Sequence, residues 1–182
     1  MVSQEAFQGG GFEELAMPLF DALFNFACWL TRNREEAEDL VQETYVKALR
    51  GFGSFQPGTN FRAWIFRILR NTFLTSRSGL AATRTVPLEE EQAEPPALVE
   101  ERTPEDVLLA LGSAAQLHRA LDELPVIFRE VLLLVDVEEM SYQEAAESLA
   151  IPIGTVMSRL ARGREQLARA LEAGRPAGLE ER

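Results

Sequence analysis

Apolar residues recur at intervals of three and four along most of this chain, the spacing that places them on one face of an α-helix. The spacing predicts a helix over residues 13–30, a second from Arg34 to about Phe52, and a third from Phe61 to about Arg77. The same period returns from Thr103 to Pro125 and from Ile127 to Val135. We therefore expect an all-α protein.

The predicted helices have recognisable starts and buried faces. Asn33 is placed as an N-cap, because its side chain can accept a backbone amide proton while Glu35 and Glu36 suit the positive end of the helix dipole. Thr103 followed by Pro104 begins a later helix in a similar way. The side chains expected to face the core are Leu15, Leu19, Leu23, Phe26 and Leu30 in the first helix, Ala37, Leu40, Val41, Thr44, Tyr45 and Ala48 in the second, Ile65, Ile68, Leu69 and Thr72 in the third, and Leu117, Ala120, Leu121, Leu124, Val131, Leu132 and Val135 later in the chain.

A change of composition divides the chain into two small helical domains. Residues 78–103 lose the helical period and gain glutamates, Pro87, Pro95 and Pro96, which predicts a flexible acidic linker. The expected parts are an N-terminal tail over 1–12, a first domain over 13–77, a linker over 78–113, a second domain over 114–173 and a C-terminal tail over 174–182.

The second domain contains a short helix, a tight turn and a longer helix. Ser141 and Glu144 form a capping box at the start of the short helix. Pro152 cannot continue that helix, and Gly154 gives the chain room to turn before a second helix from Thr155. This is the pattern of a helix-turn-helix, whose second helix enters the major groove of DNA, although a helical hairpin in a bundle has the same pattern. The second helix is expected to turn Val156, Leu160 and Leu167 inward and Ser158, Arg159 and Arg162 outward.

Charge is distributed unevenly along the chain. The net charge is −11, yet no acidic residue lies from Thr44 to Leu88 or between Glu147 and Glu165. DNA phosphates favour such surfaces, because lysine and arginine displace the counterions condensed on DNA. The two windows therefore favour nucleic-acid binding, whereas the acidic block that follows the first window is typical of a solvated segment. The windows hold Lys47, Arg50, Arg62, Arg67, Arg70, Arg77 and Arg84, and Arg159, Arg162 and Arg164.

The first window also contains a loop, Gly51 to Asn60, that is rich in glycine and small polar residues. Aromatic and arginine side chains beside a mobile loop are typical of surfaces that bind single-stranded nucleic acid. Trp64, Phe66 and Phe73 are equally explained as core residues, and for Trp64 we favour the core.

Other residues exclude several classes of function. A single cysteine, Cys28, and a single histidine, His118, allow neither a disulfide nor a zinc site of cysteines and histidines, and Cys28 is expected to be a small buried hydrophobe in a reducing cytosol. We find no catalytic constellation and expect no metal, no cofactor and no enzyme activity. We expect neither a signal peptide nor a membrane span, and hence a cytoplasmic protein.

Four motifs together resemble one protein family. NREEAEDLVQETYVKAL from Asn33, NFRAWIFRILRN from Asn60, LPVIFR from Leu124 and the helix-turn-helix from Ser141 to Arg164 occur in the order seen in extracytoplasmic-function sigma factors, the small initiation subunits of bacterial RNA polymerase. The resemblance covers about residues 13–77 and 114–171. It implies two helical domains that bind core polymerase and promoter DNA together.

The resemblance also implies roles for individual residues. The linker is expected to follow the RNA-exit path of the polymerase, and the flap of the polymerase is a further expected contact. The residues expected to dock on the clamp helices of the largest polymerase subunit are Asp39, Gln42, Glu43 and Val46, a stripe that could otherwise be a solvated face. Those expected to melt and read the minus-ten element as a single strand are Ser54, Phe55, Asn60, Phe61, Arg62, Arg67, Arg70 and Asn71. Those expected to read the minus-thirty-five duplex are Thr155, Met157, Ser158, Arg159, Arg162 and Arg164.

Two residues depart from the family pattern. Met157 stands where many relatives carry a polar or basic residue, and Gly163 is expected to make the recognition helix less rigid. The resemblance further implies an anti-sigma partner that binds zinc and responds to oxidation. Two other readings stay open, a sigma mimic that sequesters an anti-sigma factor and a helix-turn-helix repressor that acts without polymerase.

Overall fold

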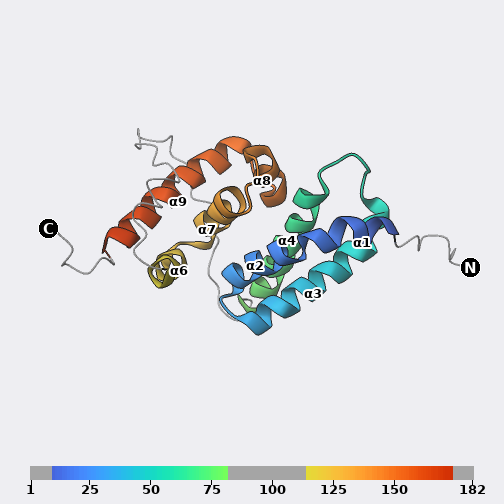
Figure 1. Cartoon of the computed structure of the whole chain (residues 1–182), viewed down its shortest axis with the longest axis horizontal. Helices are drawn as coiled ribbons and strands as arrows, with labels where there is room; N and C mark the ends of the chain where they lie inside the picture. The colour runs from blue at the N-terminus through green and yellow to red at the C-terminus, as the bar shows by residue number, and fades with distance from the viewer. Residues whose placement is uncertain (1–9, 82–113, 174–182) are drawn as a thin grey trace, which may run out of the picture. The chain divides into compact units, whose positions relative to one another are not determined.

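A computed structural model describes residues 10–81 and 114–173 of the chain, and it is helical as predicted (Figure 1). The described helices fall into two compact units. The first contains α1 to α4, and the second contains α6, α7, most of α8, and α9. The predicted linker from residue 82 onward, the helix start at Thr103 and the C-terminal tail lie outside the described residues.

The first unit begins with a helix that is interrupted rather than continuous. The structure has α1 over Gly10–Ala16, a 3-10 turn η2 over Met17–Leu19 and α2 over Phe20–Thr31, where we predicted one helix over 13–30. Pro18 lies at the start of the 3-10 turn, where its missing amide cannot bond to the preceding helix. The break leaves Leu15 exposed, although we expected it to face the core.

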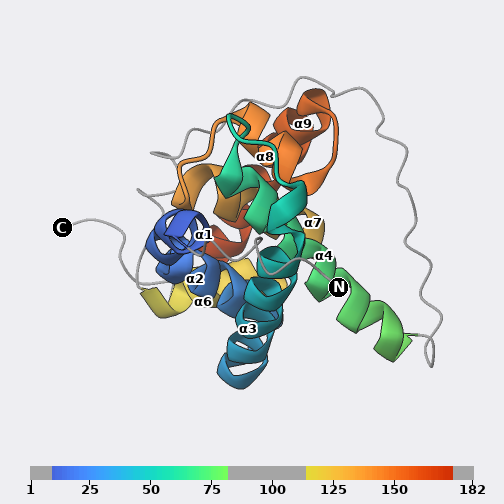
Figure 2. The ribbon, with the colours of Figure 1, turned by 90° about the vertical axis from the view of Figure 1, so that its right-hand side faces the viewer.

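Helix α3 (Arg34–Gly51) contacts both α2 and α4 (Phe61–Ala81), and the two views show it running beside them (Figure 1 and Figure 2). The predicted inward residues of α3 are buried, except that Tyr45 is half-buried. The Tyr45 hydroxyl donates to the Ala16 carbonyl at 2.8 Å, and burial raises the pKa of that hydroxyl. Phe66 stacks obliquely on Phe26, with 5.4 Å between ring centroids, in the middle of this core.

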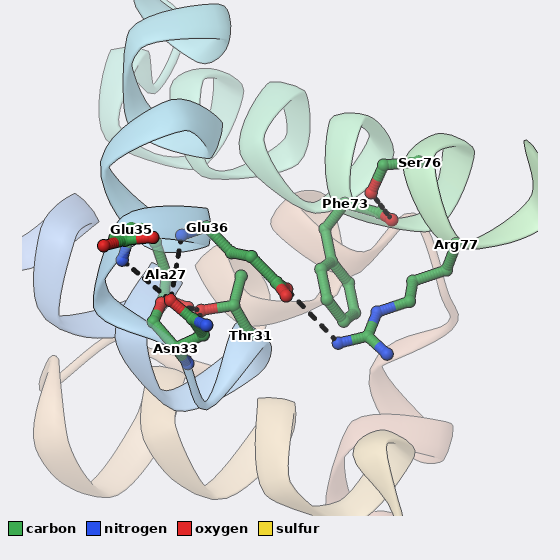
Figure 3. A network of polar contacts seen from close by, with 8 residues as sticks. All are labelled: Ala27, Thr31, Asn33, Glu35, Glu36, Phe73, Ser76 and Arg77. Atoms are coloured by element: carbon green, nitrogen blue, oxygen red, sulfur yellow. Dashed lines mark hydrogen bonds and ion pairs between the residues drawn. The ribbon is translucent and has the colours of Figure 1, made fainter. Parts of the chain in front are cut away.

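Asn33 starts α3 as predicted. Its Oδ1 accepts the amide protons of Glu35 at 2.8 Å and Glu36 at 3.3 Å (Figure 3). The Thr31 hydroxyl donates to the Ala27 carbonyl, and Arg32 at the end of α2 has a left-handed backbone with φ of 59°. The corner between α2 and α3 is therefore held by local hydrogen bonds that its own residues specify.

The second unit packs α6 (Ala114–Glu123) and α7 (Val126–Leu132) against the long helix α9 (Ile153–Ala173). The predicted helix over Ile127–Val135 ends earlier, and the chain continues as a π-helical turn, η4, over Leu133–Val137. Val131 and Leu132 are buried as expected. Val135 in the π turn and Leu117 in α6 are only half-buried.

Arg129 is the largest of the fully buried side chains described. Its guanidinium donates to the carbonyls of Leu121 at 2.8 Å, Asp122 at 3.0 Å and Leu124 at 2.7 Å. Leu121 and Asp122 lie in the last turn of α6 and Leu124 follows the helix, where backbone carbonyls lack the amides of a further helical turn. The Leu121 carbonyl also accepts the Leu124 amide proton at 3.3 Å. Arg129 therefore joins α7 to the end of α6 by satisfying buried acceptors.

The helix-turn-helix forms from α8 (Tyr142–Leu149) and α9. Its capping box is confirmed, because Glu144 accepts from the Ser141 amide at 2.8 Å and the Glu144 amide donates to the Ser141 hydroxyl at 3.2 Å. The turn differs from our prediction, since Ala150 supplies its left-handed residue with φ of 53°, whereas Gly154 lies inside the first turn of α9. Val156, Leu160 and Leu167 are buried as predicted.

Gly163 has a packing role that the sequence did not reveal. A Cβ atom at this position would lie 3.1 Å from Leu132 Cδ1 and 3.4 Å from Phe128 Cβ. The contact with Leu132 would be tighter than ordinary van der Waals packing, so the missing side chain lets α9 approach α7 closely. We expected this glycine to loosen the helix, and the structure instead explains it by close packing between two helices.

Among the helices within residues 10–81 and 114–173, none has both the length and the apolar character that a membrane crossing requires.

Candidate nucleic-acid and partner interfaces

The residues predicted to dock on a protein partner lie together on the outer side of α3. Asp39, Gln42, Glu43 and Val46 are all exposed, while Leu40, Val41 and Thr44 of the same helix are buried. The positions follow the three- and four-residue spacing of one helix face. Glu43 also pairs with Lys47 at 2.7 Å, an exposed pair within the helix. We call these four exposed side chains the α3 face.

A groove of about 350 Å³ borders the α3 face. Arg77 of α4 lies across it, 5.3 Å from the centroid of the Phe73 ring and 3.8 Å from the Glu36 carboxylate (Figure 3). The groove thus combines an apolar floor with charges of both signs. Its lining residues are Thr31, Glu36, Asp39, Leu40, Glu43, Phe73, Ser76 and Arg77.

Aromatic side chains gather around the loop between α3 and α4. Phe61 lies at the centre, with its ring centroid 5.3 Å from that of Phe55, 5.5 Å from Trp64 and 6.1 Å from both Phe12 and Phe52. We call these five side chains the loop cluster. Phe61 is only 8% exposed, and Phe55 is half-buried. Packing therefore occupies Phe61 and part of Phe55, both of which we predicted to contact DNA.

The loop itself is held by short-range hydrogen bonds. Ser54, in the 3-10 turn η3 (Phe52–Ser54), donates from its hydroxyl to the Gly51 carbonyl at 2.7 Å. Asn60 Oδ1 accepts the Ala63 amide at 3.0 Å and so caps the start of α4. Gly58 has φ of 91°, a backbone conformation that favours glycine. Of the predicted loop residues, Ser54 is exposed and Asn60 is half-buried in its capping position.

The predicted polar residues of α4 divide by exposure. Arg67 and Asn71 are exposed, four positions apart on one side of the helix, and Arg70 is half-buried. Arg62 is also half-buried, with its guanidinium 5.9 Å from the Phe66 ring centroid. Trp64, which we had assigned to the core, is half-buried at the edge of the loop cluster, on the same side of α4 as Arg67 and Asn71. The spacing of three residues between Trp64 and Arg67 was the sequence signal that Trp64 lies on the polar side of α4.

On α9, the predicted DNA-reading residues lie in two environments. Met157 is 51% exposed, and Thr155, Ser158 and Arg162 are half-buried. The Ser158 hydroxyl donates to the Thr155 carbonyl at 3.1 Å. Arg159 has its Nη1 3.8 Å from a carboxylate oxygen of Glu130, a residue of α7 that is itself buried.

Arg164 differs from the other arginines of α9. Its guanidinium makes two hydrogen bonds to Asp136 of the π turn, at 3.0 Å and 2.5 Å. The two side chains are only 14% and 21% exposed. The bidentate pair engages Arg164 with a carboxylate of its own unit, so its predicted DNA contact stays a prediction that the structure does not favour.

Cys28 is half-buried in α2, which makes it less enclosed than we predicted. Burial raises the pKa of the Cys28 thiol, and the nearby Glu38 carboxylate also raises it, while Arg34 acts in the opposite direction. The thiol is therefore less readily ionised, and less reactive, than a free cysteine.

Two family models match the chain. The model described as Sigma-70 region 2 matches residues 16–82, and the model described as Sigma-70, region 4 matches residues 114–167. The first match covers α2 to α4, with the α3 face and all of the loop cluster except Phe12, and the second covers the helix-turn-helix.

Individual relatives agree with these matches. The ECF RNA polymerase sigma factor EcfG of Rhodopseudomonas palustris is 36% identical over 162 residues, which cover 83% of this chain and 86% of the relative. The ECF RNA polymerase sigma factor SigE of Mycolicibacterium smegmatis is 38% identical over 155 residues, which cover 85% of this chain but only 59% of the relative, less than two thirds of its length.

A solved structure also resembles the chain. The sigma factor RpoE of Bartonella quintana, in complex with the anti-sigma factor NepR, is 31% identical and superposes with a TM-score of 0.67. The comparison covers 90% of this chain and 98% of that one. The family models, the relatives and the fold all agree with the motifs, and the chain belongs to the extracytoplasmic-function family of RNA polymerase sigma factors.

Proposed function

We propose that this chain is an alternative sigma factor that binds core RNA polymerase and directs initiation at promoters with two separate elements. The observation that carries the proposal is the pairing of two units in one chain: one presents an exposed face beside an aromatic-supported loop, and the other presents a helix-turn-helix. The action we propose is differential binding, in which contacts with polymerase and with the separated strand favour the open promoter.

The α3 face is the proposed docking site for the clamp helices of the largest polymerase subunit. Its four side chains are exposed in the free chain and need no rearrangement to meet a partner. Val46 supplies an apolar contact among acidic and amide groups, which suits a helical partner that carries basic residues. A partner bound there would also cover part of the groove that Asp39 and Glu43 line.

The loop cluster and the polar side of α4 are the proposed minus-ten reader. Phe61 and Asn60 support the loop from within by packing and capping, which leaves the exposed Ser54, Arg67 and Asn71 to face the strand. Unstacking one base step of the duplex costs a few kcal/mol. Two kinds of contact offset that cost: contacts of basic side chains with phosphates, and capture of an unstacked base by the loop. Because the rings of the loop cluster pack under the loop, the loop loses less conformational entropy when it holds a nucleotide.

The outer side of α9 is the proposed minus-thirty-five reader. Thr155, Met157, Ser158 and Arg159 lie in the first two turns of α9, the end of a recognition helix that reaches base edges, and Arg162 follows in the next turn. Binding by two weak sites on one chain gains from effective concentration once polymerase holds both units at the promoter. We include the flap of the polymerase among the contacts of this unit.

An anti-sigma factor is the proposed regulator. The solved RpoE relative is bound to the anti-sigma factor NepR, and a partner that covers the α3 face of this chain would compete with core polymerase. Zinc binding by that partner and a response to oxidation belong to the same proposal. A factor that works with core polymerase acts in the cytoplasm.

Capture of core polymerase tests the docking site. Replacing Gln42→Ala and Glu43→Ala together should weaken core binding about tenfold or more, because interface contacts are lost without a change in buried packing. The matched control replaces Glu13→Ala and Glu14→Ala, two exposed residues of α1, and should bind core as the parent does. Equal core capture by the Gln42, Glu43 variant and the parent would remove the α3 face from the proposal.

Promoter selection tests the second unit. Arg159→Ala should cost about 1–3 kcal/mol at the upstream element if the guanidinium contacts a base pair. The measurement is competitive transcription by the reconstituted holoenzyme on templates that differ only in that element. A variant that selects templates as the parent does would refute the assignment of Arg159.

A further inference from the structure

Glu130 is a buried carboxylate that the proposed function does not use. Its side chain is 2% exposed, and one carboxylate oxygen lies 3.8 Å from Nη1 of Arg159, whose side chain is 26% exposed. Glutamate is almost never fully buried unless it is paired. A buried ion pair contributes little net stability, because the cost of removing both charges from water offsets the attraction. A contribution to folding stability therefore does not by itself explain why a glutamate lies at this buried position.

The packing of α9 on α7 fixes where the pair forms. Gly163 allows the close approach of the two helices, since a Cβ there would lie 3.1 Å from Leu132 Cδ1. Arg159 precedes Gly163 by four residues and so lies one turn earlier on the same side of α9. Glu130 precedes Leu132 by two residues on α7. The 3.8 Å approach of Arg159 Nη1 to the Glu130 carboxylate is thus a second contact between the same two helices.

We infer that Glu130 is a specificity-determining positioning residue, which holds the guanidinium of Arg159 so that its outer edge meets a base pair of the upstream element. The inference rests on the proposed function of α9. A guanidinium is a planar fork with five donors, so it can meet a carboxylate with one nitrogen and present others to the two acceptors of a guanine edge. Glu130 touches no DNA and acts through Arg159.

The carboxylate also changes what Arg159 gains from the DNA backbone. A neighbouring negative charge offsets part of the attraction between Arg159 and phosphates, which is the part of binding that carries no sequence information. Fixing the side chain in advance lowers the entropy lost on base contact. Both effects raise the ratio of specific to non-specific binding, and neither requires tighter binding overall.

The pair formed by Arg164 and Asp136 provides a control for the pair formed by Arg159 and Glu130. It also joins α9 to an earlier segment of the second unit, but both of its side chains are largely buried and its two hydrogen bonds leave the guanidinium facing the protein. Removing the Asp136 carboxylate therefore removes an arginine–carboxylate contact of α9 in which Arg159 takes no part.

The test uses holoenzyme assembled from the full chain and core polymerase, with a template library randomised across the upstream element. Glu130→Gln keeps the shape of the side chain and removes its charge. We expect it to flatten the base preference about tenfold at the same base pair that Arg159→Ala flattens. Asp136→Asn should leave that preference unchanged. The double variant with Glu130→Gln and Arg159→Ala should show the same base preference as Arg159→Ala alone, because Glu130 acts through Arg159.

Other results of these variants would contradict the inference. Loss of preference in Arg159→Ala together with full preference in Glu130→Gln would overturn the inference and leave the proposed function standing. Full preference in Arg159→Ala would overturn the inference and remove Arg159 from the proposed minus-thirty-five reader. A further loss in the double variant, or unfolding of Glu130→Gln by circular dichroism at the assay temperature, would show that Glu130 serves the fold and not the orientation of Arg159.

Discussion

The two units support their candidate DNA-binding residues in different ways. In the first, rings pack on rings: Phe61 joins residues of the loop to α1 and to its own helix α4, and asparagine caps the helix. In the second, arginines meet carboxylates and carbonyls: Arg129 binds the end of α6, Arg164 binds Asp136, and Arg159 lies beside Glu130. Aromatic packing shapes one surface, and charge pairing orients the other.

The role of a side chain on either surface depends on what it contacts. An aromatic residue near a nucleic-acid loop can serve the core, as the burial of Phe61 shows. An arginine on a recognition helix can serve its own unit, as the bidentate pair of Arg164 shows. A residue type in a suitable stretch is therefore insufficient, and the partner of each side chain decides its role.

The largest expected effect concerns the aromatic unit. Phe61→Ala should destabilise the first unit by about 3–5 kcal/mol, because it leaves a cavity at the centre of the loop cluster. Trp29 and Trp64 are the two tryptophans of the chain and both belong to this unit, so urea unfolding followed by tryptophan fluorescence reports it. Phe55→Ala, at a half-buried ring, should cost less than half as much. Equal costs for the two variants would refute a core role specific to Phe61.

The next effect concerns the charged unit. Arg129→Ala should destabilise the second unit by about 3 kcal/mol, since it removes the buried guanidinium that donates to the carbonyls of Leu121 and Leu124 at the end of α6. Circular dichroism should show the loss while the fluorescence transition of the first unit keeps its midpoint. Arg169→Ala is the control, because Arg169 is exposed on α9, and it should change stability by less than about 0.5 kcal/mol. A fluorescence midpoint that moves as far as the dichroism midpoint would contradict separate support of the two units.

The smallest effect concerns the contact between α7 and α9. Gly163→Leu should cost about 1–3 kcal/mol, because the added atoms have no space between Leu132 and Phe128. Gly154→Leu is the matched control on the same helix, where no atom lies within 4 Å of an added Cβ. Urea unfolding by circular dichroism compares the two. Similar stabilities for both variants would show that α9 does not depend on close approach at Gly163.

Local features were predictable from the sequence. The N-cap at Asn33 and the capping box of Ser141 and Glu144 formed as expected, because each involves residues two or three positions apart. The three-residue spacing also placed most of the buried faces correctly. Pro18 was the local signal that we did not use, and it interrupts the predicted first helix.

Features that join distant parts of the chain were not predictable. Asp136 lies 28 residues before Arg164, and no pattern within one helix indicates that they pair. The same holds for Glu130, which lies beside Arg159. The packing role of Gly163 also depends on a distant segment, because it is the close approach of α7 that leaves no space for a side chain. The sequence located the candidate surfaces, but the division of their residues between support and contact came from the three-dimensional packing.

Run-off transcription requires both units to act through core polymerase on one promoter. The full chain, core polymerase and a library of genomic fragments should yield transcripts that begin at defined sites downstream of a shared pair of elements, and core alone should not. A stable dimer that binds duplex DNA tightly without polymerase would indicate a repressor. Failure to associate with core, with no transcript from any template, would contradict the account.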